Sequence, residues 1–493
     1  MPPRTKVLVA GAGPTGLSAA YHLGEDALLV ERNREVGGWC RSVVHDGFTF
    51  DYAGHIMFSN DPYVHELYEK LLGDNVHWQD REAWIWSKNV YTRYPFQGAL
   101  YGLPPQVIKE CLLGAIEARY GTAAADAACA VGKGIDGKGI DDCCADGLLE
   151  STAPLANGNG NGNGHVNGNG HAPSAVESFE AFIHRVWGRG IAEHFALPYN
   201  RKLWKVPLSE METSWLGGRV PMPDLGEMID GALSPSPKPM GPNARFGYPL
   251  RGGFQALVDG FLPLLHRPPR LGTSVVGLSA NERAARLSDG STVRFDSFVS
   301  TMPLPELVRL LGEEAPLFVR DAARGLRHVS VRCVHLGVGR PNLTEKHWIY
   351  YPEDPVFHRI FVQGNASPFC NPEGGFGLTC EITYTDEHPL PAEGDALIER
   401  CIADARRVGM LRADDPVWTA TQTDLPYAYV VYDAGRAARV ATLRRWLAER
   451  GIHLAGRYSE WEYYNSDHAF LAGRRVAGEV RTGAGAAEEV AET

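Results

Sequence analysis

The stretch that decides the fold of this chain lies near its start, Lys6–Glu31, and reads KVLVAGAGPTGLSAAYHLGEDALLVE. A short β-rich run at 6–10 leads directly into a glycine turn. Residues 15–23 have the apolar spacing of a helix, and residues 27–31 form a second apolar run that ends in an acid. Strand, glycine turn, helix and strand in this order predict a Rossmann-like α/β unit.

Three glycines of the turn, in the pattern G-x-G-x-x-G, have separate roles. Gly11 makes the tight turn, Gly13 lets the backbone approach a pyrophosphate, and Gly16 lets helix and strand pack closely. The pyrophosphate would lie at the helix N-terminus, where free N–H groups and the dipole favour an anion. Glu31 stands where a carboxylate accepts hydrogen bonds from ribose hydroxyls and repels a 2′-phosphate. The stretch therefore predicts a bound dinucleotide other than NADP.

The composition is that of an ordinary globular chain. Its 493 residues suffice for two to four domains, with 44% apolar and 22% charged residues. The net charge of −11 argues against a nucleic-acid or anionic membrane surface as partner. We find no apolar run of transmembrane length, and MPPRTK is not a signal peptide. The nine cysteines show no repeating spacing, so we expect a cytoplasmic protein with reduced thiols.

Two further glycine motifs follow the opening stretch. Gly37 and Gly38, with Arg41 close behind, predict a loop that closes over the phosphates of the cofactor. Gly54 stands beside His55 after a strand, and this pair would let backbone and imidazole approach a flat ligand. We therefore count Gly38 and Arg41 as cofactor-binding residues and His55 as a catalytic candidate.

These motifs resemble those of known flavoproteins. The opening is similar to the FAD-binding half of the amine oxidase and protoporphyrinogen oxidase superfamily. The segment 54–59, GHIMFS, resembles the G-G-H-x-I-F-S motif of UDP-galactopyranose mutases, with Ala53 in place of one family glycine. The resemblance implies FAD as cofactor, and it implies that His55 lies against the flavin ring near N5.

Segments along the rest of the chain match the same family in order. They are YPFQ at 94–97, PYNRKLW at 198–204, WLGGRV at 215–220, WIYYPED at 348–354 and GRYSEWEYYNSDH at 456–468. The resemblance implies that Tyr94, Phe96 and Gln97 hold a uracil base. The substrate-binding tyrosines implied by the family are Tyr350, Tyr427 and Tyr463.

Two arginines are implied to clamp the diphosphate of the substrate. Arg359 falls on the second pyrophosphate arginine of the family. Arg201 stands where we align the arginine of bacterial mutases, whereas Leu197 replaces the arginine of eukaryotic-type enzymes. Two such arginines could form charge-assisted forks on a diphosphate. Asp224 stands where an asparagine is expected, which leaves the sugar open.

The resemblance also implies contacts to the cofactor from distant parts of the chain. The backbone near Val276 would contact the adenine end. The terminal motif would hold the flavin through Gly456, Arg457, Asn465 and Ser466, where a second helix N-terminus is expected.

We expect three domains. The FAD-binding domain comprises 1–90, 240–302 and 448–481. A helical substrate domain spans 91–239 and contains an Asn-Gly-rich, disordered insertion at 121–175. A mixed-sheet substrate domain spans 303–447, and a disordered tail covers 482–493. The insertion contains His165, His171, Cys143 and Cys144, but their spacing matches no zinc pattern, so no metal is expected.

The activity implied by the resemblance is the interconversion of the pyranose and furanose forms of a UDP-linked sugar. Reduced FAD would bond to the sugar through N5, and NAD(P)H would first reduce the flavin in the pocket that binds the substrate. The alternatives are an FAD-dependent oxidoreductase of the amine oxidase or desaturase type and a flavin-binding protein without catalysis. The nucleotide, the oligomeric state and the role of the insertion stay open.

Overall fold

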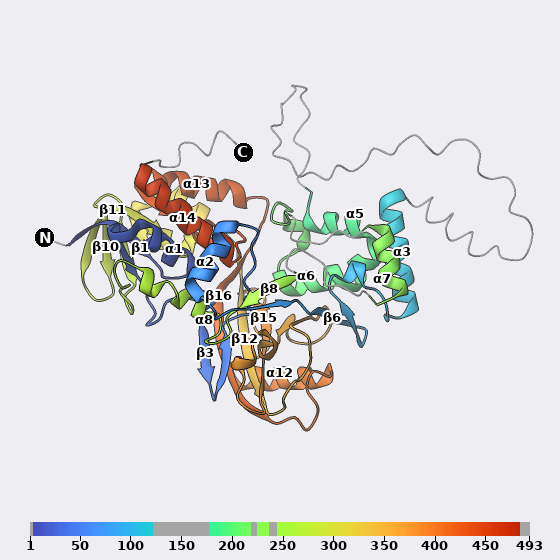
Figure 1. Ribbon diagram of the computed structural model, residues 1–493. Coiled ribbons are helices and arrows are strands. Elements are labelled where there is room, and N and C mark those ends of the chain that lie inside the picture. The colour runs from blue at the N-terminus through green and yellow to red at the C-terminus, as the bar shows by residue number, and fades with distance from the viewer. Residues whose placement is uncertain (1–2, 122–176, 218–223, 236–243, 484–493) are drawn as a thin grey trace, which may run out of the picture.

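The opening stretch forms the βαβ unit that its pattern predicts. The strands β1 (Arg4–Ala10) and β2 (Ala27–Val30) pair in parallel, and α1 (Pro14–Leu23) crosses between them. The last four residues of β1 are buried, because both faces of a parallel strand are covered. The described chain, shown in the computed structural model of Figure 1, comprises residues 3–121, 177–217, 224–235 and 244–483.

Segments from two later parts of the chain complete this sheet. The strand β11 (Thr292–Ser300) pairs in parallel with β1 and with β17 (Ile452–Leu454). The strands β10 (Ala284–Leu287) and β9 (Val275–Ser279) extend it in antiparallel fashion. The helices around it are α2 (Pro62–Leu72), α8 (Gln255–Asp259), α9 (Leu304–Leu311), α10 (Leu317–Arg324), α13 (Arg436–Ala448) and α14 (Ser466–Thr482). We call this part the dinucleotide lobe.

A seven-stranded sheet forms a second lobe, the sheet lobe, below the first in Figure 1. Its order is β16-β12-β15-β14-β13-β6-β7. The bounds are β16 (Val417–Val430), β12 (His328–Val338), β15 (Phe376–Tyr384), β14 (Arg359–Phe361), β13 (Trp348–Tyr350), β6 (Ala83–Ser87) and β7 (Val90–Arg93). The helix α12 (Gly394–Arg407) packs on β12 and β16.

The hairpin β6–β7 departs from the expected domain division. β6 lies at the end of the segment 1–90 and β7 crosses the boundary expected after residue 90, but β6 pairs in parallel with β13 of the sheet lobe. Two short pairs, β3 (Ser42–His45) with β4 (Phe48–Asp51) and β5 (His77–Asp80) with β8 (Arg245–Tyr248), lie outside both large sheets. The chain therefore enters the sheet lobe at β6 and β7 before it forms α3 (Pro105–Tyr120).

The helical lobe lies to the right in Figure 1. Its helices are α3 (Pro105–Tyr120), α5 (Phe179–Ile191), α6 (Leu197–Trp204) and α7 (Leu225–Leu233), and a π-helical turn at Ala192–Ala196 joins α5 to α6. Apart from Gly121, Thr482 and Gly483, the insertion predicted at 121–175 and the tail predicted at 482–493 lie outside the described residues. None of the helices in the described ranges is both long and apolar enough to cross a membrane.

Close backbone contact between α3 and α5 depends on glycine. A Cβ added at Gly190 would lie 2.2 Å from the carbonyl oxygen of Glu110. We expect Gly190→Ala to lower the free energy of unfolding by about 1–3 kcal/mol, because the helices must separate. Gly478 on α14 has no atom within 4 Å of such a Cβ, so Gly478→Ala should be neutral or slightly stabilising. Urea unfolding of both variants tests this, and equal midpoints would contradict it.

Candidate active site

A cavity of about 1310 Å³ lies between the dinucleotide and sheet lobes. It opens at the carboxyl ends of β1, β2 and β17, the edge at which open α/β sheets bind ligands. Residues from β12, β13, β14 and β15 form its other wall. Its volume exceeds the range of about 300–1,000 Å³ usual for one ligand pocket, so it has room for a second ligand beside a dinucleotide.

Most of the predicted site residues line this cavity. The predicted cofactor residues among them are Gly11, Gly13, Glu31, Gly38, Val276, Gly456, Arg457, Asn465 and Ser466. The predicted catalytic and substrate residues among them are His55, Arg359, Tyr94, Tyr350, Tyr427 and Tyr463. The fold thus brings together side chains that stand more than 400 positions apart in the sequence.

Two of the predicted cofactor residues act from behind the cavity wall. A Cβ at Gly16 would lie 1.8 Å from the carbonyl oxygen of Gly11, so this glycine serves close packing of α1. Arg41 donates from Nε to the carbonyl oxygen of Gly38 at 2.9 Å, and its guanidinium lies 4.4 Å from the ring centroid of Tyr52. Arg41 therefore braces the glycine loop.

The structure does not bring Arg201 to the cavity. The buried residues of α6 include Tyr199 and Trp204, and Arg201 lies on the outer face of the same helix. Its side chain is 59% exposed and forms an ion pair with Glu180 at 2.9 Å. Arg201 and Arg359 therefore do not form the expected clamp in this arrangement.

The predicted base-binding pair also lies outside the cavity lining. Phe96 is fully buried and stacks on Phe195 at a centroid distance of 5.0 Å. Gln97 is buried beside it. Of the segment 94–97, Tyr94 alone is among the cavity-lining residues.

The glycine loops and Glu31 shape the dinucleotide end of the cavity. The Cα of Gly13 would lie 3.2 Å from a Cβ at Gly38, so side chains at this point would fill the space beside the α1 N-terminus. The Glu31 carboxylate is buried and accepts from Ala12 N at 2.7 Å and from Asn33 N at 2.9 Å. These bonds hold its remaining lone pairs in place for ribose hydroxyls.

The other end of the cavity fits the flat ring of a flavin. The Nε of Arg457 is buried and has no hydrogen-bond partner among the described residues. A buried donor of this kind is costly unless a ligand supplies an acceptor, as the carbonyl groups of a flavin do. The N-terminus of α14 at Ser466 lies in the same wall. The residues present therefore fit FAD.

His55 has a defined orientation and charge. Its Nδ1 lies 2.7 Å from the carbonyl oxygen of Ala53, so Nδ1 carries the proton and Nε2 is an acceptor. The ring stacks on Phe254 at 5.2 Å. Burial lowers the pKa of His55 to about 4, so the imidazole is neutral at neutral pH.

This lowered pKa predicts a loss of stability in acid. The unfolded chain binds a proton at His55 below about pH 6.5, whereas the folded protein does so near pH 4. Between these values, stability falls as the pH falls, by at most about 3 kcal/mol from this residue. In His55→Asn the free energy of unfolding should decrease less between pH 6.5 and pH 4 than in the parent protein. The exposed control His388→Asn should show the same decrease as the parent protein. Urea unfolding at several pH values tests this, and identical profiles would refute it.

Arg359 and Glu381 form a buried ion pair in the sheet-lobe wall. Arg359 donates from both Nε, at 3.1 Å, and Nη2 to the same oxygen of Glu381, Oε2, and we call this two-donor contact the fork. The Glu381 side chain is fully buried, and its other oxygen accepts from Gly54 N at 3.4 Å. The hydroxyl of Tyr429 lies 3.5 Å from Arg359 Nη2. The pair thus connects the sheet lobe to the loop that carries His55.

Two residues of this wall, Arg81 and Glu381, were not predicted from the sequence as site residues. Arg81 donates to the Tyr350 hydroxyl at 2.9 Å, and its guanidinium lies 5.0 Å from the ring centroid of Trp348. Arg81 belongs to none of the family-like sequence motifs, so no local signal indicated its role. Glu381 had one signal, because it is a single acid within the apolar strand FGLTCEITY.

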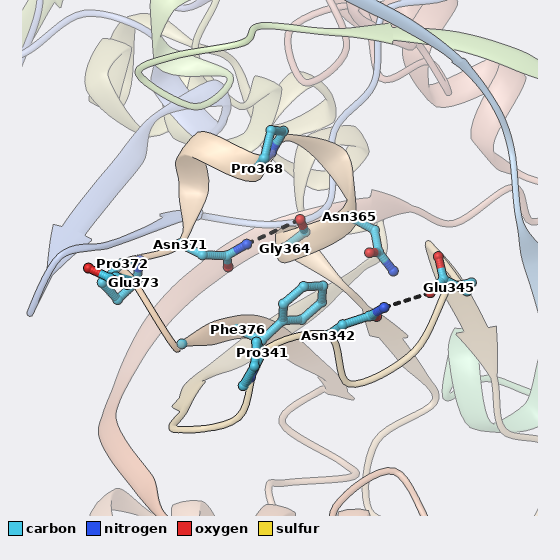
Figure 2. A pocket seen from close by; sticks show the side chains of 11 residues that line it. Pro341, Asn342, Glu345, Gly364, Asn365, Pro368, Asn371, Pro372, Glu373 and Phe376 are labelled. Carbon is cyan, nitrogen blue, oxygen red and sulfur yellow. Dashed lines mark hydrogen bonds between the residues drawn. The ribbon is translucent and has the colours of Figure 1, made fainter.

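A second hollow, of about 530 Å³, lies on the sheet lobe (Figure 2). Its amide groups are used within the fold: Asn371 donates to the carbonyl oxygen of Gly364 at 3.2 Å, and Asn342 donates to Glu345 at 2.7 Å. None of the predicted site residues lines it. In the described ranges, no group of three or more His, Cys, Asp or Glu could hold a metal, and the four insertion residues considered for zinc lie outside those ranges.

Comparison with solved structures agrees with this architecture. The crystal structure of a reduced UDP-galactopyranose mutase is 26% identical, covers 98% of this chain and 94% of its own, and has a TM-score of 0.81. A CLA-producing fatty acid isomerase from P. acnes (14% identical, 96% and 98% covered, TM-score 0.60) shares the fold. So does a wild-type putrescine oxidase bound to putrescine (17% identical, 97% and 99% covered, TM-score 0.58). The expected fold class and the resemblance to the mutases are thereby confirmed.

The curated proteins match a shorter part of the chain than the solved structures do. A 4,4'-diapophytoene desaturase (4,4'-diaponeurosporene-forming) of Staphylococcus aureus (strain COL) is 41% identical over 61 residues. The match spans 12% of this chain and 12% of the length of that relative. The likeness is therefore local.

Two family models together match most of the chain. A model for the NAD(P)-binding Rossmann-like domain matches residues 9–71. A model for flavin containing amine oxidoreductases matches residues 174–481, more than half of the chain. The chain therefore belongs to the family of flavin containing amine oxidoreductases.

Proposed function

We propose that this flavoprotein is a mutase that interconverts the pyranose and furanose forms of a UDP-linked sugar. The observation that carries the proposal is the charge of the cavity wall away from the dinucleotide end. There Arg81 and Arg359 place two guanidinium groups against one carboxylate, that of Glu381. Such an excess suits a diphosphate. The mutase of known structure also resembles this chain over nearly its full length.

FAD would be held by the glycine loops, Glu31 and the N-termini of α1 and α14. In its reduced form it would supply the nucleophile that displaces the nucleotide diphosphate from the anomeric carbon. NAD(P)H as the reductant is part of the proposal.

The protein's own residues would position the substrate and balance its charge. Arg359 is held in a fork by Glu381, and Arg81 is held by Tyr350. Both can therefore meet a diphosphate without reorganising, which favours the charge that develops when the diphosphate detaches. His55 is neutral and fixed, so it shapes the reacting region without adding charge.

For the nucleobase, we propose Tyr94 as the contact in the arrangement seen here. Phe96 and Gln97 could contribute after the helical lobe moves, because Phe96 is now stacked on Phe195. We propose no role in binding the diphosphate for Arg201, whose guanidinium is engaged by Glu180 on the outer surface.

An oxidoreductase acting by hydride transfer is the second candidate, supported by the family and by the putrescine oxidase of similar fold. A cationic amine is a poor substrate for this cavity. The space beside Tyr429 and Tyr463 already contains the guanidinium of Arg457, which would repel it. A neutral substrate would suit this alternative better.

The test is to reduce the FAD-loaded protein with dithionite under nitrogen, add UDP-galactofuranose and follow UDP-galactopyranose by chromatography. We expect conversion with reduced flavin and none with oxidised flavin. NADH or NADPH should replace dithionite. If UDP-galactofuranose and other nucleotide sugars are all inert, the proposal is wrong, and oxygen uptake with neutral oxidisable substrates then tests the alternative.

A further inference from the structure

Arg457 is a cavity-lining guanidinium with no carboxylate among the described residues to balance it. It follows Gly456 just after the last strand of the dinucleotide lobe, β17. Its hydrogen bonds within the described chain go to two backbone carbonyl oxygens, from Nη1 to Tyr464 at 2.7 Å and from Nη2 to Ala428 at 2.8 Å. Its Nε is buried without a partner among the described residues. The side chain is thus fixed in place, and its charge is not neutralised.

Aromatic rings surround this charge. The guanidinium carbon lies 4.7 Å from the ring centroid of Tyr463, 5.5 Å from that of Tyr429 and 5.7 Å from that of Tyr458. Cation–π contacts of this kind contribute about 0.5–2 kcal/mol each. They hold the guanidinium in position, but they leave the positive charge uncancelled.

Three other buried or partly buried arginines of the described chain are balanced by carboxylates. Arg359 pairs with Glu381, Arg436 with Glu462, and Arg475 with Glu460. Removing one partner of such a pair is strongly destabilising, because the remaining charge is left uncompensated. Arg457 has this uncompensated character in the protein itself. We therefore expect a bound anion to supply the countercharge.

The position of Arg457 indicates which anion this is. A Cβ at Gly456 would lie 2.4 Å from the Thr15 hydroxyl, so the segment packs directly against the start of α1. The charge of Arg457 also acts on His55 and Cys40, which line the same part of the cavity. Arg359 also contacts Tyr429 and acts on His55, but its charge is already balanced by Glu381. Arg457 has no such carboxylate among the described residues and lies on the segment that packs against α1, so we assign the cofactor ring as its anion.

We propose that Arg457 supplies the countercharge for reduced, anionic FAD and thereby raises the reduction potential of the bound cofactor. A hydride donor adds two electrons and one proton to the neutral oxidised ring. The product carries one negative charge, delocalised over N1 and the C2 carbonyl, and Arg457 stabilises that charge. The proposal needs bound FAD but not the mutase reaction, so its test is independent of the sugar.

The test compares reduction potentials of FAD-loaded protein by dithionite titration against a reference dye. We expect Arg457→Gln to weaken the preference for the reduced state about tenfold to a hundredfold, a fall of about 30–60 mV for a two-electron couple. Arg457→Lys keeps the charge and should retain most of the potential. Arg474→Gln, a matched loss of charge on the exposed face of α14, should leave the potential unchanged.

A second measurement decides the matter if Arg457→Gln does not retain FAD. Sulfite adds to N5 of oxidised flavin and places a negative charge on the same part of the ring, so the unsubstituted protein should bind sulfite and have a higher potential than free FAD. An unchanged potential in flavin-loaded Arg457→Gln would overturn the proposal. So would a weaker affinity for UDP at constant potential, because the charge would then serve the diphosphate.

Discussion

Replacing Arg359 by methionine is expected to lower kcat/KM for UDP-galactofuranose by about 10²–10³-fold, the loss typical of one preorganised charge-stabilising donor. The reason is geometric. The Arg359 fork is held by Glu381 in the cavity wall, so the guanidinium is already in place when the diphosphate leaves. Arg359→Lys should recover little, because an ammonium cannot reproduce the fork with Glu381.

The matched control is Arg201→Met. Both arginines were expected from sequence to bind the diphosphate, but Arg201 is exposed and paired with Glu180. We expect its kcat/KM to stay within about twofold of the parent protein, since a surface ion pair contributes about 0–1 kcal/mol. Kinetics with chemically reduced enzyme measure both variants. Equal losses in the two would show that the helical lobe closes to bring Arg201 into the site.

Replacing Glu381 by glutamine is expected to lower the free energy of unfolding by about 3–5 kcal/mol, the usual cost of breaking a buried ion pair by removing one partner. Glu381 is fully buried, and the variant leaves the Arg359 charge without its carboxylate. The contact to Gly54 N would change as well, which loosens the loop before His55. Urea unfolding of the FAD-loaded protein measures the loss.

The double variant Arg359→Met/Glu381→Gln shows whether Glu381 stabilises the fold through its charge or through its packing. It removes both partners, so its stability should exceed that of Glu381→Gln alone, although its activity should be lost. Contacting residues of this kind show interaction energies of about 0.5–3 kcal/mol in double-mutant cycles. Additive losses would mean that Glu381 acts through packing and not through its charge.

The dinucleotide end could be predicted from sequence because its determinants are local. Gly11, Gly13, Gly16 and Glu31 act within one βαβ unit, whose strand and helix periods are visible in a single stretch. The cavity-facing residues at the start of the last helix, Asn465 and Ser466, were placed by resemblance, and the structure brings them to the same cavity.

The substrate end depended on tertiary structure. Arg201 and Arg359 are equally plausible as charged residues in family-like segments, but the face of α6 that carries Arg201 turns outward while β14 carries Arg359 to the cavity. Glu381 acquires its role because β15 pairs with β14 and places it opposite Arg359. Arg81 enters the site because β6 crosses to the sheet lobe and pairs with β13.

By itself, therefore, the sequence determined the family of fold, the dinucleotide site and the loop that carries His55, since short-range periodicity and glycine spacing encode them. Which arginines face the cavity, and which carboxylate balances Arg359 or Arg201, was decided by strand pairing and helix rotation between separate segments, 22 residues apart for Arg359 and Glu381 and 269 residues apart for Arg81 and Tyr350. A charge buried without a partner is costly, and no single stretch of sequence contains the strand pairing that places Glu381 beside Arg359.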